Sequence, residues 1–219
     1  MTTTPVELKL LPRSEYAGIN RDDPIRFYSL PVIGKMYRRR VEMCLAECTG
    51  GERVLEVGFG SGVTFLNLHE NYREIHGLDL TANVEQVARV FRARGIETDL
   101  HNGSVLAMPY APDTFDTVLL ISILEHLKPA EQEAAFREIA RVLRPGGQVV
   151  YGVPVERKLM VFAFRVLGYN IREHHFSTEK QVSAAADAVL ERVCVTPMRS
   201  LLGSVYEVGH FVKPESART

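Results

Sequence analysis

Apolar and polar residues follow two different rhythms between residues 51 and 153. Short apolar stretches, typical of strands covered on both faces, alternate with segments whose apolar positions recur at helical spacing. The apolar stretches predict strands at about 53–57, 74–79, 96–101, 115–121 and 147–153. The other segments predict a helix capped by Ser61, one capped by Thr81 that ends near Gly95, and one from Pro129 to Val142. This alternation is typical of an α/β fold with a parallel sheet.

The regions on either side depart from this alternation. Residues 1–24 are polar and interrupted by prolines, which predicts an arm with little structure of its own. Residues 25–48 have helical spacing, with a break expected near Pro31 and Gly34. An insertion at about 154–176, which contains an apolar run, is followed by a predicted helix to about 190 and two strands at 192–196 and 205–212. We expect one domain at 51–219 and an N-terminal arm and helical segment at 1–50.

The first predicted strand leads directly into a glycine-rich turn, Gly58-Phe59-Gly60-Ser61-Gly62. Alternate glycines allow sharp turns and remove side chains where a ligand would approach the backbone. The second strand ends at Asp79, whose carboxylate suits the hydroxyls of a ribose. The pattern therefore predicts a nucleoside site. A dinucleotide fingerprint would need a third glycine at the position of Val63, which argues against a nicotinamide cofactor.

Glycines at relative positions one, three and five, with Glu56 two residues earlier, resemble the first motif of class I S-adenosylmethionine-dependent methyltransferases. Three later segments resemble the same family in order and spacing: Phe115–Ile121 its fourth strand, Arg141–Gly147 the turn before its fifth strand, and Asp79 its ribose-binding acid. The run Leu124-Glu125-His126-Leu127 is similar to one in the small-molecule branch of the family.

This resemblance implies a Rossmann-like, doubly wound, mostly parallel seven-stranded sheet with helices on both faces. Its antiparallel last strand would pair as a hairpin with its predecessor, and the N-terminal helical segment would form a lid over the cofactor cleft. The implied cofactor is S-adenosyl-L-methionine, with Asp79 on the ribose, Leu80 on the adenine and Ile121 at the methionine end. The full implied set is Glu56, Gly58, Gly60, Gly62, Asp79, Leu80, Gly103, Ser104, Val105 and Ile121. Ser104 stands where the family often has Asp, so the contact with the adenine amine is weaker.

The acceptor is predicted to be a small, fairly apolar molecule bound between the N-terminal segment and the insertion. Ile121-Ser122-Ile123-Leu124 lacks the polar Pro-Pro-aromatic run of amino-group methyltransferases, and it offers neither a nucleophilic cysteine nor clustered metal-binding carboxylates. Methyl transfer needs a general base only when the nucleophile is weakly acidic. The candidates are His174 and His175, with His126 as a mainly structural alternative.

A net charge of −1 gives no reason to expect nucleic acid as a partner, and no apolar run is long enough to cross a membrane. The N-terminus lacks the features of a signal peptide, and three cysteines favour reduced thiols, so a cytoplasmic enzyme without a metal site is predicted. The cluster Lys35, Arg38, Arg39 and Arg40 is either a solvated face or a patch for an anionic substrate or lipid head group. Three alternative functions stay open: a lipid head-group methyltransferase, a nicotinamide-dependent oxidoreductase and a non-catalytic S-adenosylmethionine-binding module. The sequence does not indicate the oligomeric state.

Overall fold

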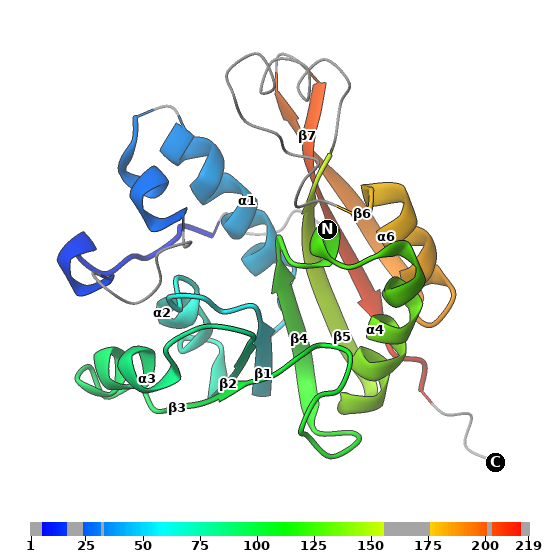
Figure 1. Ribbon diagram of the computed structural model, residues 1–219, viewed down its shortest axis with the longest axis horizontal. Coiled ribbons are helices and arrows are strands. Elements are labelled where there is room, and N and C mark those ends of the chain that lie inside the picture. Colours follow the sequence, from blue (N-terminus) through cyan, green and yellow to red (C-terminus); the bar gives the residue numbers. More distant parts are fainter. Residues whose placement is uncertain (1–5, 17–23, 32, 156–175, 201–202, 216–219) are drawn as a thin grey trace.

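One seven-stranded sheet runs through the molecule (Figure 1). The computed structural model describes residues 6–16, 24–31, 33–155, 176–200 and 203–215. The strands are β1 (Gly51–Val57), β2 (Tyr72–Asp79), β3 (Thr98–Asn102), β4 (Phe115–Ile121), β5 (Leu143–Pro154), β6 (Glu191–Ser200) and β7 (Gly203–Val212). Their order is β3-β2-β1-β4-β5-β7-β6; β1 to β5 pair in parallel, and β7 is antiparallel to both β5 and β6. The predicted doubly wound sheet and its terminal hairpin are confirmed.

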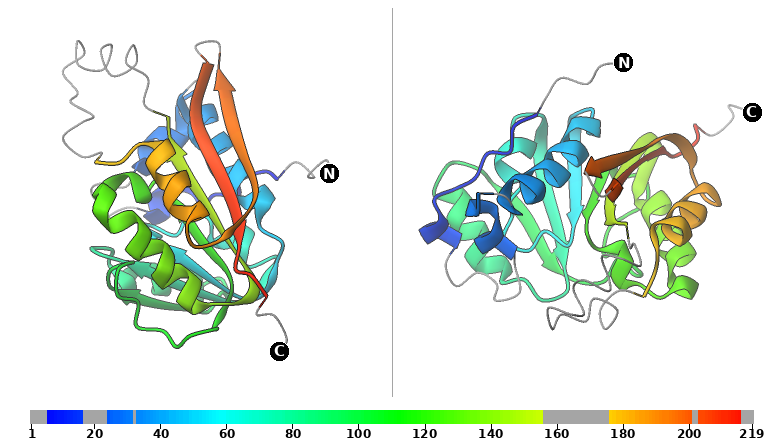
Figure 2. Two further views of the ribbon diagram at one scale, coloured as in Figure 1. Left: turned by 90° about the vertical axis from the view of Figure 1, so that its right-hand side faces the viewer. Right: turned by 90° about the horizontal axis from the view of Figure 1, so that it is seen from above.

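Helices cover both faces of this sheet, as Figure 2 shows. The helices are α1 (Ile33–Glu47), α2 (Phe65–Leu68), α3 (Val84–Arg92), α4 (Pro129–Val142) and α6 (Glu179–Asp187). Leu119 of β4 packs in one core cluster with residues of α1, α2 and α3, while its neighbours Val118 and Leu120 pack in a second cluster with residues of α4 and α6. Because successive side chains of a strand point to opposite faces, β4 carries apolar residues on both faces, and six of its residues, 115–120, are buried.

Two predicted helix starts are wrong, for local reasons. Ser61 does not cap a helix, because Gly60 and Gly62 on either side have positive φ (52° and 70°) and α2 begins only at Phe65. Thr81 does not cap the next helix, because its backbone N–H donates to the carboxylate of Asp79 at 2.8 Å. The cap of α3 is Asn83, whose side chain accepts from the backbone of Gln86. By contrast, β4 and α4 have the predicted bounds.

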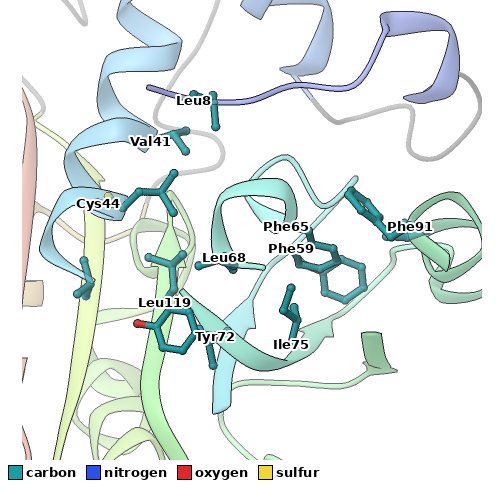
Figure 3. Packing of buried hydrophobic residues seen from close by; sticks show 14 of the residues in the cluster. Leu8, Val41, Cys44, Phe59, Phe65, Leu68, Tyr72, Ile75, Phe91 and Leu119 are labelled. Carbon is teal, nitrogen blue, oxygen red and sulfur yellow. The ribbon is translucent and has the colours of Figure 1, made fainter. Parts of the chain in front are cut away.

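The N-terminal segment packs more closely than the predicted arm. Leu8, Leu11 and Tyr16 are buried, and Leu8 lies beside Val41 of α1 in the core cluster of Figure 3. The amide of Asn67 holds the extended part of the segment, since it accepts from the backbone of Lys9 and donates to that of Glu7, both at 2.9 Å. The segment is therefore part of the core of this fold rather than a free arm.

The helical pattern at 25–48 breaks where Pro31 predicted, but not at Gly34. A short 3₁₀-helix, η2 (Pro24–Ser29), precedes α1, and Gly34 lies inside α1. A Cβ on Gly34 would lie 2.5 Å from the carbonyl oxygen of Tyr28, so this glycine lets η2 pack against the start of α1. Of the predicted insertion, residues 156–175 lie outside the described residues.

Candidate functional site

The loop after β1 reaches the carboxyl edge of the sheet in a conformation that needs glycine. Gly58, Gly60 and Gly62 have φ of 75°, 52° and 70°, in the left-handed region that side chains disfavour. A Cβ on Gly58 would lie 2.0 Å from the side chain of Ile123. A Cβ on Gly62 would meet the rings of Phe65 and Phe91 within 3 Å. The first and last glycines are therefore required by the packing of the chain itself.

Asp79, at the end of β2, connects the glycine loop after β1 to the loop after β2. One carboxylate oxygen accepts from the backbone N–H of Gly60 at 3.0 Å, and the other accepts from Thr81 and Ala82 at 2.8 and 2.9 Å. A carboxylate has about four acceptor positions, so a half-buried Asp79 with three backbone donors keeps capacity for a ligand hydroxyl. The carboxylate therefore lies against the glycine loop, as the sequence predicted.

Glu56 has a supporting position rather than an exposed one. It is 3% exposed, and the hydroxyl of Thr64, just before α2, donates to it. This bond joins the end of β1 to the start of α2, so it stabilises the glycine loop between them.

The residues predicted to contact the adenine differ in their exposure to solvent. Leu80 is 73% exposed, which leaves an apolar surface beside Asp79. Gly103 donates its N–H to the carbonyl of Asp79 at 3.0 Å, and half-buried Ser104 accepts from the backbone of Leu106 at 3.2 Å. The side chain of Val105 is buried in the core, so Leu80, Gly103 and Ser104 present the surface on this side.

The end of β4 carries a strained residue. Ile121 is half-buried, and Ser122 beyond it has φ of 58°, which is uncommon for a residue other than glycine. The Ser122 backbone N–H donates to the carbonyl of Gly152 at 2.8 Å, and its hydroxyl lies 3.0 Å from that of Tyr206 on β7. Strained backbone is often found at functional sites because the surrounding structure must hold it in place.

Arg40 of α1 completes this group. Its Nη1 donates to the Ser122 hydroxyl at 3.5 Å, and its guanidinium carbon lies 4.0 Å from the centre of the Tyr37 ring and 6.0 Å from that of Tyr206. Burial lowers the pKa of Arg40, but the neighbouring tyrosines raise it, and the net shift is upward. Arg40 is therefore a cation, and among the described residues no carboxylate lies within ion-pair distance of it. Sequence reasoning missed this group because its members are far apart along the chain.

The predicted basic cluster does not form one surface. Arg38 donates to the backbone carbonyls of Tyr28 and Leu8 at 3.3 and 3.5 Å, and Arg40 faces Ser122. Only Lys35 and Arg39 are exposed.

Of the three candidate histidines, the structure describes only His126. His126 is exposed at the end of the 3₁₀-helix η3 (Leu124–His126), while Glu125 beside it is buried. His174 and His175 lie outside the described residues. The next residue, Phe176, donates its backbone N–H to the carbonyl of Glu125 at 2.8 Å. The chain therefore returns from the insertion to the loop that follows β4.

Two further predictions concern cysteines and membranes. The three cysteines are free; Cys44 is buried, and Cys48, the residue after the end of α1, donates its thiol to the carbonyl of Cys44. Within the described part of the chain, no helix has the length and apolar character needed to cross a membrane.

Comparison with known proteins agrees with this geometry. Residues 54–147 match the family model of a methyltransferase domain. A ubiquinone biosynthesis O-methyltransferase of Aromatoleum aromaticum is 31% identical over 150 residues, which are 66% of this chain and 62% of that protein. A demethylmenaquinone methyltransferase of Tropheryma whipplei is 30% identical over 114 residues, 51% of this chain and 46% of the relative. The chain thus spans about half to three fifths of the length of the curated relatives it matches.

The fold has solved counterparts. The N-methyltransferase NodS of Bradyrhizobium japonicum, in complex with S-adenosyl-L-homocysteine, superposes with a TM-score of 0.68 at 18% identity. The match covers 93% of this chain and 96% of NodS. The matched family model, the methyltransferase relatives and this shared fold agree with the glycine loop and with Asp79 at the sheet edge. Residues 54–147 therefore match a methyltransferase domain, and the chain is similar to the class I S-adenosylmethionine-dependent methyltransferases, a family whose cofactor is S-adenosylmethionine.

Proposed function

We propose that this chain transfers a methyl group from S-adenosylmethionine to a small, fairly apolar organic acceptor. The observation that carries the proposal is the carboxylate of Asp79 bonded to the backbone of Gly60 at 3.0 Å. It lies at the carboxyl ends of β1 and β2, next to the point between β1 and β4 where the strand order reverses. Ligands of open α/β sheets bind in the crevice at such a point.

The residues at this edge suit the parts of the cofactor. Asp79 would accept hydrogen bonds from the ribose hydroxyls, exposed Leu80 would pack on the adenine, and Gly103 and Ser104 would lie along its edge. We add Arg40 to the predicted set, because the methionine end carries a carboxylate that a half-buried guanidinium would neutralise.

The cofactor supplies an activated methyl group on a sulfonium, so the protein contributes mainly alignment and exclusion of water. The acceptor would lie beside the aromatic group of Tyr37 and Tyr206, near Ser122. The names of the ubiquinone and menaquinone relatives support an apolar ring as the acceptor class. Where the acceptor atom is a hydroxyl or an acidic carbon, His174 or His175 would remove its proton, with His126 as the structural alternative.

The other functions suggested by the sequence are less well supported. The match of residues 54–147 to a methyltransferase domain argues against a nicotinamide-dependent oxidoreductase. The inward positions of Arg38 and Arg40 remove half of the basic patch that a lipid head group would need. A cytoplasmic location and a division at residue 50 into lid segment and catalytic domain remain part of the proposal.

The test combines binding with turnover. Calorimetry should show binding of S-adenosylhomocysteine and no comparable binding of NADH. Incubation with labelled S-adenosylmethionine and a panel of hydroxylated aromatic compounds and quinols should give a methylated product. Cofactor binding without turnover of any acceptor would instead identify a non-catalytic module, and tighter binding of NADH would refute the proposal.

A further inference from the structure

Three metal-ligating side chains meet where the end of α1 approaches the terminal hairpin. Glu47 is the last residue of α1, Cys194 lies on β6 and His210 on β7. Cys194 and His210 are register partners in the antiparallel pairing of β6 and β7. Their side chains therefore stand on the same face of the sheet, close together. This is the face that α1 covers through its contacts with β5 and β7.

The separations of Cys194 and His210 from Glu47 are those of ligands on one ion. In a tetrahedral zinc site, two ligand atoms lie about 3.3 Å apart for nitrogen and oxygen and about 3.6 Å apart for sulfur and oxygen. Here Nδ1 of His210 lies 3.2 Å from Oε2 of Glu47, and Sγ of Cys194 lies 3.6 Å from the same oxygen. All three ligand atoms are within 4.8 Å of one another.

The surroundings also suit an ion. His210 is only 8% exposed, and Glu47 and Cys194 are half-buried. The three side chains are therefore shielded from solvent to different degrees, and they come from α1, β6 and β7. Thiolate, imidazole and carboxylate groups are all ligands of zinc in proteins. Burial and the Glu47 carboxylate raise the pKa of the Cys194 thiol, so binding would displace a proton from this sulfur.

We propose that Glu47, Cys194 and His210 form a binding site for a zinc-like divalent transition-metal ion, with water as the fourth ligand. The ion joins the end of α1 to the β6–β7 hairpin. Glu47 precedes Cys194 by 147 positions and His210 by 163 positions in the sequence. The ion holds the end of α1 against the sheet, and α1 carries Arg40 about two turns away. The proposal does not depend on which acceptor the protein methylates.

The experiment uses the full chain. Purified protein is stripped with chelator and titrated with Zn²⁺ against a chromophoric competitor, and with Co²⁺ while thiolate-to-cobalt absorption is recorded. We expect one equivalent of Zn²⁺ with micromolar or tighter affinity, a cobalt–thiolate band, and a melting temperature that rises with Zn²⁺. Cys194→Ser should weaken Zn²⁺ binding at least tenfold and remove the band.

Two variants distinguish a bound metal ion from a cluster that is held by hydrogen bonds alone. Cys48→Ser is the matched control, because Cys48 is also a half-buried thiol near Glu47 but bonds to Cys44 instead. It should keep both binding and the band. His210→Gln keeps a donor for Glu47 but is a poor ligand, so it should lose Zn²⁺-dependent stabilisation while still folding. If the wild-type chain binds no Zn²⁺, or if Cys194→Ser binds as tightly as wild type, the group is a hydrogen-bonded cluster and the proposal is overturned.

Discussion

Replacing Asp79 tests the cofactor site most directly. In Asp79→Asn, the amide oxygen can keep the bonds from Thr81 and Ala82, but an NH₂ group replaces the oxygen that accepts from Gly60 at 3.0 Å. The new NH₂ group then faces the backbone N–H of Gly60, so two donors meet, and one acceptor for the ribose hydroxyls is lost. A charge-assisted hydrogen bond contributes about 1.5–3 kcal/mol, so the lost ribose bond alone should weaken binding about 10- to 100-fold.

The assay is calorimetry with S-adenosylhomocysteine and with methylthioadenosine, which keeps the ribose but lacks the amino-acid end. Both should bind at least tenfold more weakly to Asp79→Asn. Asp99→Asn is the control, since Asp99 is an exposed carboxylate on the neighbouring strand β3 that pairs with His76 and His101. Circular dichroism and thermal unfolding of the free variants check the fold. An unchanged dissociation constant in a folded Asp79→Asn would show that Asp79 does not bind the ribose.

Three other predictions concern the methionine end, the base and pH. Arg40→Met should weaken S-adenosylhomocysteine about tenfold or more in calorimetry but leave methylthioadenosine nearly unchanged, because only the former carries a carboxylate; equal losses would refute this role. At saturating acceptor, changing His174 and His175 together to Asn should lower turnover about 10²–10⁴-fold with little effect on cofactor affinity, and normal turnover of the double variant would exclude both as bases. Burial raises the pKa of Cys48 from 9.0 to about 12, so the unfolded chain releases this proton first and stability should fall as pH rises between these values. Urea unfolding at pH 8 and pH 10.5 should show a smaller decline for Cys48→Ala, and an equal decline would count against this assignment.

The sequence predicted those parts of the protein that depend on short-range pattern. The bounds of β4 follow from a mostly apolar run, and those of α4 from a proline start with helical spacing. The glycine loop and Asp79 could be paired in advance, because the carboxyl ends of neighbouring parallel strands meet at one edge of a sheet. Helix starts failed where a local hydrogen bond or a positive φ competed with the capping pattern, as at Thr81 and Ser61.

Long-range side-chain groups were decided only by the tertiary structure. Arg40, Ser122 and Tyr206 come from α1, the end of β4 and β7, and no spacing rule indicates that the fold packs them together. The same is true of Cys194 and His210, whose meeting depends on the register of the terminal hairpin and on where α1 crosses it. The sequence by itself indicated the order of elements, the resemblance to a methyltransferase family and the cofactor that this resemblance implies, because these depend on periodicity and on motifs within a few tens of residues. The tertiary structure decided which charged side chains are buried, because burial depends on the packing of elements far apart in the chain.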